Sequence, residues 1–278
     1  MLTVQPSGQA CGAVATGIDL SRPLAAAEVE ALRSAWLESK VLALPDQDLT
    51  DADLVRITET LGGMGDDPFF GSISEDNPVV ALTRRADEKA PVFAQSWHSD
   101  WSFKARPPIG TCLYAITIPP VGGNTGFVNQ ALALKEMPDS LRRKLEGGKA
   151  LHSAATAYAP DGMYGDHASE RDRSMKIIYS EEARDVYAHP FIITHPETGE
   201  ETLFGCAGYI CGVEGMAQEE AMEIIGELYQ WQTQERFQYT HRWQERMLVI
   251  WDNRSVLHRA YGGYDGYDRE LHRTTIAA

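Results

Sequence analysis

Short apolar runs that end at glycine or proline dominate the hydrophobic pattern of this chain. The run at 109–118 is closed by Pro119-Pro120, and the turn Gly122-Gly123 leads into another run at 125–128. Runs of this length, bounded by turn residues, are typical of β-strands. The pattern predicts strands at 41–44, 78–82, 109–118, 125–128, 151–155, 191–194, 201–204, 247–251 and 256–258.

Helical periodicity appears in several longer segments. In the first of them the apolar residues Val29, Leu32 and Trp36 recur at the spacing of one helix face. Thr50, followed three residues later by Asp53, resembles a capping box with Asp in place of Glu. We therefore predict helices at 25–39, 50–61 and 217–234, with shorter helical pieces around 132 and at 140–145.

Many short strands with few helices predict a mainly β fold with flanking helices, in which the strands form a jelly-roll β-sandwich. No internal repeat, low-complexity tract or long linker divides the sequence, so residues 1–278 are interpreted as one domain. The segment 157–185 is rich in charge and glycine and lacks clear periodicity. Irregular segments of such length are usually functional lids or disordered.

The charge balance restricts the partners of this protein. A formal net charge of −15 argues against nucleic acid and anionic membrane surfaces. No apolar run is long enough to span a membrane, and the first residues lack the pattern of a secretory signal. The 4 cysteines show no zinc-type spacing and are too few for a disulfide framework. We expect reduced thiols and a cytoplasmic location.

The candidate chemistry is concentrated at Trp97-His98-Ser99-Asp100. In a strand, residues two positions apart point to the same face, so His98 and Asp100 can reach one metal ion. His258 would supply a second imidazole. Two histidines and one carboxylate form the facial set that binds non-haem Fe(II) and leaves coordination positions open.

Basic residues follow His258 near the end of the chain. Arg269 and Arg273 would place a cation near the metal, able to hold a carboxylate through paired N–H donors. Thr125 offers a hydroxyl to the same anion. The sequence thus predicts a metal centre with a neighbouring anion site.

Together these segments resemble the taurine dioxygenase and phenoxyacetate dioxygenase (TauD/TfdA) family of Fe(II)/2-oxoglutarate-dependent dioxygenases. The resemblance covers nearly the whole chain, from Gly12 to Thr275. The segments that carry it are Trp97-His98-Ser99-Asp100, Gly122-Gly123-Asn124-Thr125, Trp251-Asp252-Asn253-Arg254, His258-Arg259 and His272-Arg273.

The resemblance implies a double-stranded β-helix core, cupin-like, with His98, Asp100 and His258 on iron. It implies that 2-oxoglutarate chelates the metal through its keto acid end, while its far carboxylate meets Thr125 and Arg269. The implied reaction uses O2 to convert 2-oxoglutarate to succinate and CO2 while a substrate is hydroxylated. The presence of Asp100 favours hydroxylation, because the related halogenases lack this carboxylate.

The expected substrate is a small organic anion, either a carboxylate such as an aryloxyalkanoate or a sulfonate. Arg273 lies at the family position that often contacts an anionic group of the substrate. Asp67 aligns with a sulfonate-binding histidine of taurine enzymes, where a carboxylate would repel a sulfonate. Trp101 and Phe103 would build an aromatic wall beside the substrate.

Alternatives to this function stay open at this point. A carboxylate at Asp67 can pair with an ammonium group, so the same chemistry, hydroxylation or desaturation, on an amine-bearing metabolite is one alternative. A metal-binding β-sandwich without redox activity is another. Members of the family commonly form homodimers or homotetramers, but no interface can be identified in the sequence.

The remaining histidines are interpreted mainly as structural. His189 and His195 each precede a proline, a context typical of strand ends and turns. His167 and His241 receive the same interpretation. His152 and His272 lie near segments that carry the resemblance, and these two stay open as residues that would line the site.

Overall fold

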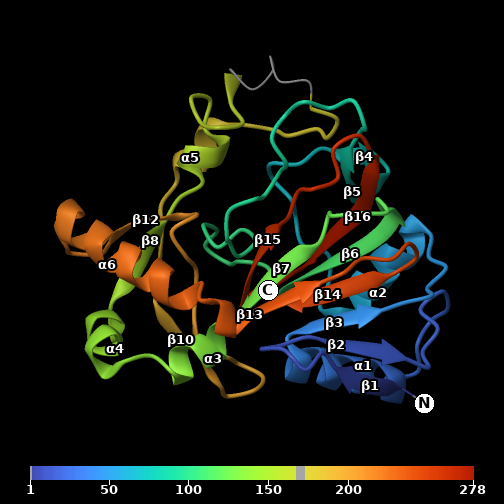
Figure 1. Cartoon of the computed structure of the whole chain (residues 1–278), viewed down its shortest axis with the longest axis horizontal. Helices are drawn as coiled ribbons and strands as arrows, with labels where there is room; N and C mark the ends of the chain where they lie inside the picture. The colour runs from blue at the N-terminus through green and yellow to red at the C-terminus, as the bar shows by residue number, and fades with distance from the viewer. Residues whose placement is uncertain (1, 167–172) are drawn as a thin grey trace.

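A large β-sheet forms the centre of the computed structural model, which describes residues 2–166 and 173–278 (Figure 1). Its strand order is β1-β2-β3-β14-β6-β16-β5-β4, and β2 pairs with β3 in the parallel direction while the other pairs are antiparallel. The strands are β1 (Thr3–Pro6), β2 (Ala13–Thr16), β3 (Val41–Leu44), β4 (Ser72–Ser74), β5 (Asn77–Arg84), β6 (Gly110–Thr117), β14 (Leu248–Asp252) and β16 (Arg269–Ile276).

A smaller antiparallel sheet, ordered β13-β7-β15, packs against the large one. Side chains from both sheets share one core, in which Val249 and Trp251 of the large sheet lie with Phe127 and Tyr239 of the small one. Two sheets packed in this way form a jelly roll. The strands of the small sheet are β7 (Thr125–Asn129), β13 (Gln238–His241) and β15 (Val256–Ala260).

Strand β14 is buried on both faces, which explains its unbroken apolar run. Because side chains alternate along a strand, Val249 and Trp251 point toward the small sheet while Leu248 and Ile250 point the other way. Leu248 and Ile250 belong to a second core with Trp36, a residue of the helices that cover the outer face of the large sheet. These helices are α1 (Ala26–Ser39) and α2 (Asp51–Leu61).

The predicted capping box at the start of α2 is confirmed. The Thr50 hydroxyl oxygen accepts a hydrogen bond from the Asp53 N–H at 3.2 Å, and the Thr50 N–H donates to the Asp53 carboxylate at 2.9 Å. Both bonds satisfy N–H groups that the first turn of a helix leaves without partners.

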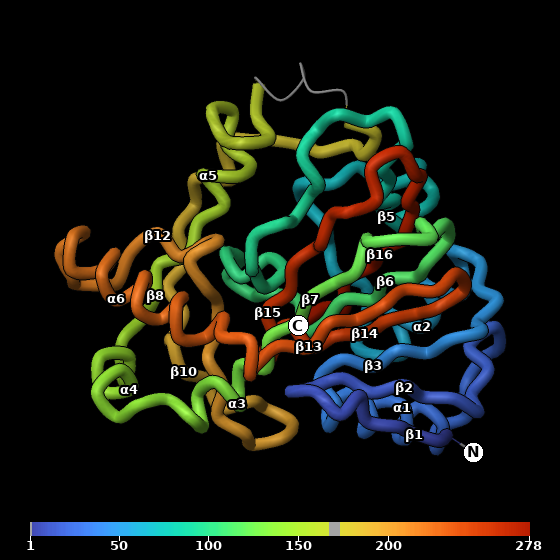
Figure 2. Tube along the Cα trace, viewed as in Figure 1, coloured from blue at the N-terminus to red at the C-terminus, as the bar shows by residue number. Residues whose placement is uncertain are grey.

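A second group of elements lies beside the sandwich, at the left of Figures 1 and 2, and has its own apolar core. Leu257 of β15 belongs to this core together with Leu228 and Phe191, so the small sheet is covered from this side. In the described part of the chain no helix is long and apolar enough to cross a membrane. The elements here are α3 (Gln130–Lys135), α4 (Asp139–Leu145), β8 (Lys149–His152), α5 (Ala155–Tyr158), η2 (Glu181–Arg184), β9 (Tyr187–Pro190), β10 (Ile192–Thr194), β11 (Glu201–Leu203), β12 (Ile210–Val213), α6 (Gln218–Gln232) and η3 (Glu235–Phe237).

Irregular segments meet over one end of the sandwich, at the top of Figure 2. The Ser174 N–H donates to the Glu88 carboxylate at 2.8 Å, and the Gly71 N–H donates to the Lys176 carbonyl at 3.1 Å. The segment that the sequence suggests as a lid takes part in these contacts, although its residues 167–172 lie outside the described part of the structure.

A buried charge network fixes the turn between β14 and β15. The Asp252 carboxylate, 1% exposed, accepts hydrogen bonds from His195 at 2.9 Å and from the Arg254 guanidinium at 2.7 Å. Burial alone would raise the pKa of Asp252, but His195 and Arg254 lower it below its usual value. Asp252 therefore stabilises the fold above the pKa of the unfolded state, and this contribution is lost as pH falls through the folded-state pKa.

We expect Asp252→Asn to lower the free energy of unfolding by about 1–3 kcal/mol, because the buried hydrogen bonds to a charged carboxylate are lost while Arg254 keeps its ion pair with the partly exposed Glu197. Urea unfolding at neutral pH measures this. Asp161→Asn is the matched control, since Asp161 is exposed and pairs with Arg184 at the surface, where such pairs contribute at most about 1 kcal/mol. Equal stability of the two variants would contradict the structural role of Asp252.

Candidate metal centre and substrate cavity

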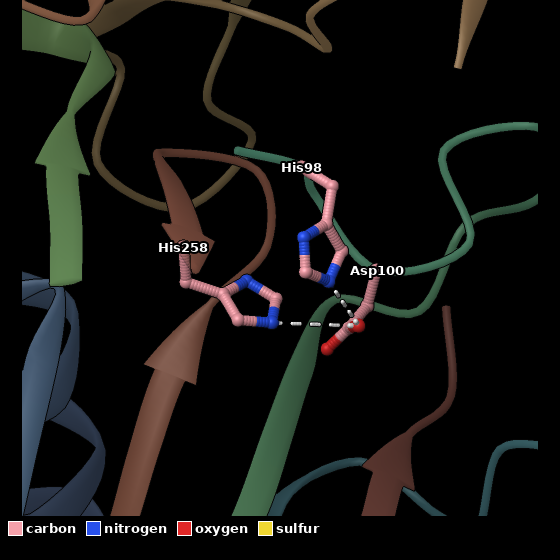
Figure 3. Close-up of side chains that lie close together, drawn as sticks. All are labelled: His98, Asp100 and His258. Carbon is pink, nitrogen blue, oxygen red and sulfur yellow. Dashed lines mark ion pairs between the residues drawn. The ribbon is translucent and has the colours of Figure 1, made fainter. Parts of the chain in front are cut away.

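The predicted metal ligands converge, but not entirely by the predicted local structure (Figure 3). The His98 N–H donates to the His258 carbonyl at 3.0 Å, and the His258 N–H donates to the His98 carbonyl at 2.8 Å. Within residues 97–100, only His98 forms such a strand-like pair. Asp100 begins a turn in which Trp101 has a φ of 48°, so the turn, and not a strand, brings the carboxylate beside the imidazoles.

The three side chains point at a common position. Asp100 Oδ1 lies 3.8 Å from His98 Nε2 and 3.6 Å from His258 Nε2, and the three ligand atoms lie within 4.8 Å of one another. His98 Nδ1 donates to the Ser96 carbonyl at 2.9 Å, which leaves Nε2 as the unprotonated nitrogen. This is the two-histidine, one-carboxylate arrangement that suits Fe(II).

Neighbouring groups orient the Asp100 carboxylate. Its Oδ2 atom accepts a hydrogen bond from the Thr111 hydroxyl at 2.6 Å, and that hydroxyl in turn accepts from the Asn253 side-chain amide at 3.0 Å. The Trp251 indole N–H donates to the side-chain oxygen Oδ1 of Asn253, also at 3.0 Å. This series of hydrogen bonds holds Oδ2 of Asp100 and leaves Oδ1 directed at the histidines. Hydrogen bonds around metal ligands generally orient them in this way.

Burial and charge give the three groups the protonation states that a metal requires. Burial lowers the pKa of His98. Burial also lowers the pKa of His258, to about 3, and the neighbouring His98 adds to this shift. Burial acts in the opposite direction on Asp100, but Arg273 and the histidines outweigh it and hold the pKa of Asp100 well below its usual value. At neutral pH the site therefore offers two neutral imidazoles and a carboxylate, the forms that bind metals.

A cavity of about 90 Å³ opens beside these residues and adjoins an outer hollow of about 530 Å³. Thr125 and Arg269 lie on the wall of the inner cavity, together with all three ligand residues. Both cavities are bordered by irregular segments over the end of the sandwich, which contribute Val92 and Arg173 to the two walls. The inner wall includes Phe70, Leu82, Phe93, Ala94, Trp101, Tyr158, Met175, Tyr209 and Arg273.

Arg269 is a buried cation. Among the described residues, no carboxylate forms an ion pair with it. It is 9% exposed, its Nε has no hydrogen-bond partner among the described residues, and burial lowers its pKa to about 10. The Thr125 oxygen accepts a hydrogen bond from the Trp243 indole at 2.9 Å, so the Thr125 hydroxyl hydrogen remains able to donate. A buried charge normally has a partner, so this pair of donors fits the carboxylate of a bound anion.

The residues predicted to contact the primary substrate divide into two sets. Arg273 and Trp101 line the inner cavity, whereas Asp67 and Phe103 lie behind its wall. Asp67 Oδ1 is 2.8 Å from the Arg273 guanidinium and accepts a hydrogen bond from the Trp101 indole at 2.7 Å. Phe103 packs its ring 4.8 Å from that of Tyr209, between centroids.

Tyr158 and Tyr209 border both cavities and were not predicted from the sequence. Their hydroxyls are hydrogen-bonded to each other, and the Tyr209 ring lies edge-on to His98. Neither residue belongs to a segment with a recognisable motif, so no signal in a single sequence identified them.

The other histidines are structural wherever the structure describes them. His189 donates to the Lys104 carbonyl, His241 bonds the Tyr239 hydroxyl, and His195 bonds Asp252. His152 and His272, left open as lining residues, do not border the described cavities. His152 is buried against the Ser102 hydroxyl, and His272 pairs with Asp51 at 2.6 Å. His167 lies outside the described residues.

The family follows from a comparison with known proteins. A family model described as "Taurine catabolism dioxygenase TauD, TfdA family" matches residues 3–275. The chain belongs to this family. It is accordingly a dioxygenase that uses Fe(II), 2-oxoglutarate and O2, and the resemblance noted in its sequence is confirmed.

Individual TauD/TfdA relatives span most of the chain. A 2,4-dichlorophenoxyacetate dioxygenase of Cupriavidus pinatubonensis is 30% identical over 93% of this chain and 91% of the relative. A sulfate ester dioxygenase of Pseudomonas putida is 30% identical over 99% and 89%, respectively. Both names specify dependence on alpha-ketoglutarate, which is 2-oxoglutarate.

A solved structure confirms the predicted fold class. The crystal structure of a taurine dioxygenase from Burkholderia xenovorans superimposes with a TM-score of 0.81 and 27% identity. The match covers 100% of this chain and 89% of that one. The mainly β, cupin-like jelly roll with flanking helices is therefore the fold of this dioxygenase.

Proposed function

We propose that this dioxygenase hydroxylates a small organic acid in the cavity next to its metal centre. In this proposal His98, Asp100 and His258 bind Fe(II), and Thr125 and Arg269 bind the far carboxylate of 2-oxoglutarate. The observation that carries the proposal is the position of Arg269, a buried cation without a described carboxylate partner, on the same cavity wall as the three ligands.

The division of labour among the side chains follows from their positions. When bound, the ferrous ion supplies the reaction with O2 that converts 2-oxoglutarate to succinate and CO2 and oxidises the substrate. Arg269 and Thr125 fix one end of 2-oxoglutarate, and Thr111 orients the carboxylate of Asp100. The aromatic wall excludes water from the substrate, which protects the oxidising chemistry from side reactions.

The lining of the cavity supports an acid with an apolar body. Trp101, Phe70 and Tyr158 form a continuous aromatic surface, with ring centroids 4.9 Å apart between Phe70 and Trp101. The relatives named above act on an aryloxyacetate and on sulfate esters, which combine an apolar group with an anion. We propose that the substrate shares this combination, with its anionic group toward Arg273.

The alternatives raised by the sequence lose their support. The Asp67 carboxylate already faces Arg273 and Trp101, so it is not available to an ammonium group of an amine-bearing metabolite. A non-redox β-sandwich is not supported either, because the relatives are dioxygenases.

Turnover tests this proposal. The protein, supplied with Fe(II), ascorbate, O2 and 2-oxoglutarate, is expected to release succinate faster when an accepted aryloxyalkanoate or alkyl sulfate is added. Removing iron with a chelator should abolish this release, and adding Fe(II) should restore it. Anaerobic addition of Fe(II) and 2-oxoglutarate should give a visible charge-transfer band, and Zn(II) should not. Absence of the band would refute the proposed cosubstrate site.

We also propose that residues 1–278 act as one domain in the cytoplasm, as a homodimer or homotetramer. All four cysteines are free thiols, which suits a reducing compartment. Light scattering on the purified protein measures the oligomeric state.

A further inference from the structure

Asp67 and Arg273 form a buried ion pair at the substrate wall, in which Arg273 lines the cavity and Asp67 lies behind it. Their side chains are 7% and 3% exposed, and Nη1 of Arg273 lies 2.8 Å from Asp67 Oδ1. The Trp101 indole N–H donates to the same carboxylate oxygen. The guanidinium also lies over the rings of Phe70 and Trp101, each 5.0 Å from the ring centroid. The pair is therefore fixed from several sides.

The second anion near Arg273 is Asp100, at 3.2 Å from Nη2. Asp100 is one of the proposed iron ligands, and a ligand shares its negative charge with the metal. Asp67 is then the group that balances Arg273.

The other arginines of the inner wall are held by other groups or assigned to another ligand. Arg84 is paired with Glu88 at 3.2 Å and donates to the Ala90 carbonyl. Arg269 is assigned above to 2-oxoglutarate. Arg173, which also borders the outer hollow, donates to the Pro91 carbonyl and lies over the Tyr164 ring. Arg273 is thus the cation beside Asp100 on the substrate side, and its charge is already matched.

We propose that Asp67 determines the charge preference of the substrate pocket by competing with the substrate for Arg273. The anionic group of an acid gains little there, because it approaches Asp67 as well as the guanidinium. An uncharged hydrogen-bond acceptor, such as an amide or ester, binds about as well, and the aromatic wall supplies most of the affinity. The substrate class therefore extends from small aryl acids to their neutral analogues. This inference rests on the proposed function.

Matched probes test the proposal. Phenoxyacetate and phenoxyacetamide differ mainly in charge, and their binding is followed anaerobically through the visible band of the Fe(II)–2-oxoglutarate complex. Wild-type protein is expected to bind both with similar affinity. Asp67→Asn frees the guanidinium, and the ratio of acid to amide affinity should rise by about tenfold or more, the range of one charge-assisted hydrogen bond.

Further variants separate charge from structure. Asp67→Asn/Arg273→Gln replaces the pair by neutral groups of similar shape, and its affinity ratio should match that of the wild type. Arg273→Gln alone leaves the Asp67 charge and should shift the ratio toward the amide, even where Asp67→Asn does not fold. Asp66→Asn is the control, because Asp66 is exposed and pairs with Lys104. It should leave the ratio unchanged.

The outcomes distinguish this inference from the proposed function. A wild-type protein that strongly prefers phenoxyacetate, or an Asp67→Asn protein with an unchanged ratio, would overturn the inference while the visible band persists. The same holds if neither probe perturbs the band in any variant. Absence of the band in wild-type protein would instead show that the cosubstrate site was wrongly assigned.

Discussion

Asp100→Ala is expected to abolish Fe(II) binding and substrate-dependent succinate release together. The substitution removes the one anionic ligand of the three and leaves two neutral imidazoles facing Arg273. Changes to groups that only support a metal ligand typically cost about 10–100-fold in metal affinity, so loss of the ligand itself should cost more. Metal content after gel filtration and the visible band with 2-oxoglutarate measure the effect.

Thr111→Val provides the graded comparison for Asp100→Ala. It removes the hydroxyl that donates to Asp100 Oδ2 and keeps the side-chain shape, so iron affinity should fall by about 10–100-fold while the site still forms. Circular dichroism establishes that both variants are folded. An Asp100→Ala protein that retains iron and turnover would show that the metal lies elsewhere.

The second large effect is expected from Arg269→Ala. If Arg269 holds a carboxylate in a buried site, removing it should weaken 2-oxoglutarate binding by about 3–5 kcal/mol, more than about a hundredfold in Kd. Anaerobic titration of the visible band with 2-oxoglutarate measures this directly. Iron content should stay the same, because Arg269 lies on β16 and contributes no ligand atom.

Two variants define the origin of that loss. Arg269→Lys keeps the charge but not the planar fork of N–H donors, so it should recover only part of the affinity. Arg85→Ala removes an exposed arginine that pairs with Glu270, and 2-oxoglutarate should bind this variant normally. A small effect of Arg269→Ala would mean that another cation of the cavity wall binds the cosubstrate.

The regular elements were largely predictable because burial leaves a simple pattern in the sequence. Strand β14 appears as a continuous apolar run since its alternate residues enter two different cores. Local hydrogen bonds override such patterns elsewhere. A strand is predicted at 151–155, but the observed strand β8 ends at His152. There the Ser153 hydroxyl accepts from the Ala155 N–H, and α5 begins.

The candidate site was predictable where motifs and the family resemblance marked its residues, and not where a contact depends on loop packing alone. His98, Asp100, His258, Thr125 and Arg269 all border the inner cavity, as expected for one metal centre with a neighbouring anion site. The pairing of Asp67 with Arg273 depends on how a loop after α2 packs against β16, which no local pattern reports. Tyr209 reaches the cavity from another distant segment for the same reason.

The paired amides of His98 and His258 have a consequence for the apoprotein. Each N–H is bound by the carbonyl of the other residue, so the two ligand-bearing segments are already joined through their backbones. Hydrogen exchange at both amides should therefore be slow without iron and slow to a similar degree with it. The entropy of bringing these ligands together is lost when the chain folds, so binding of the metal does not have to supply it.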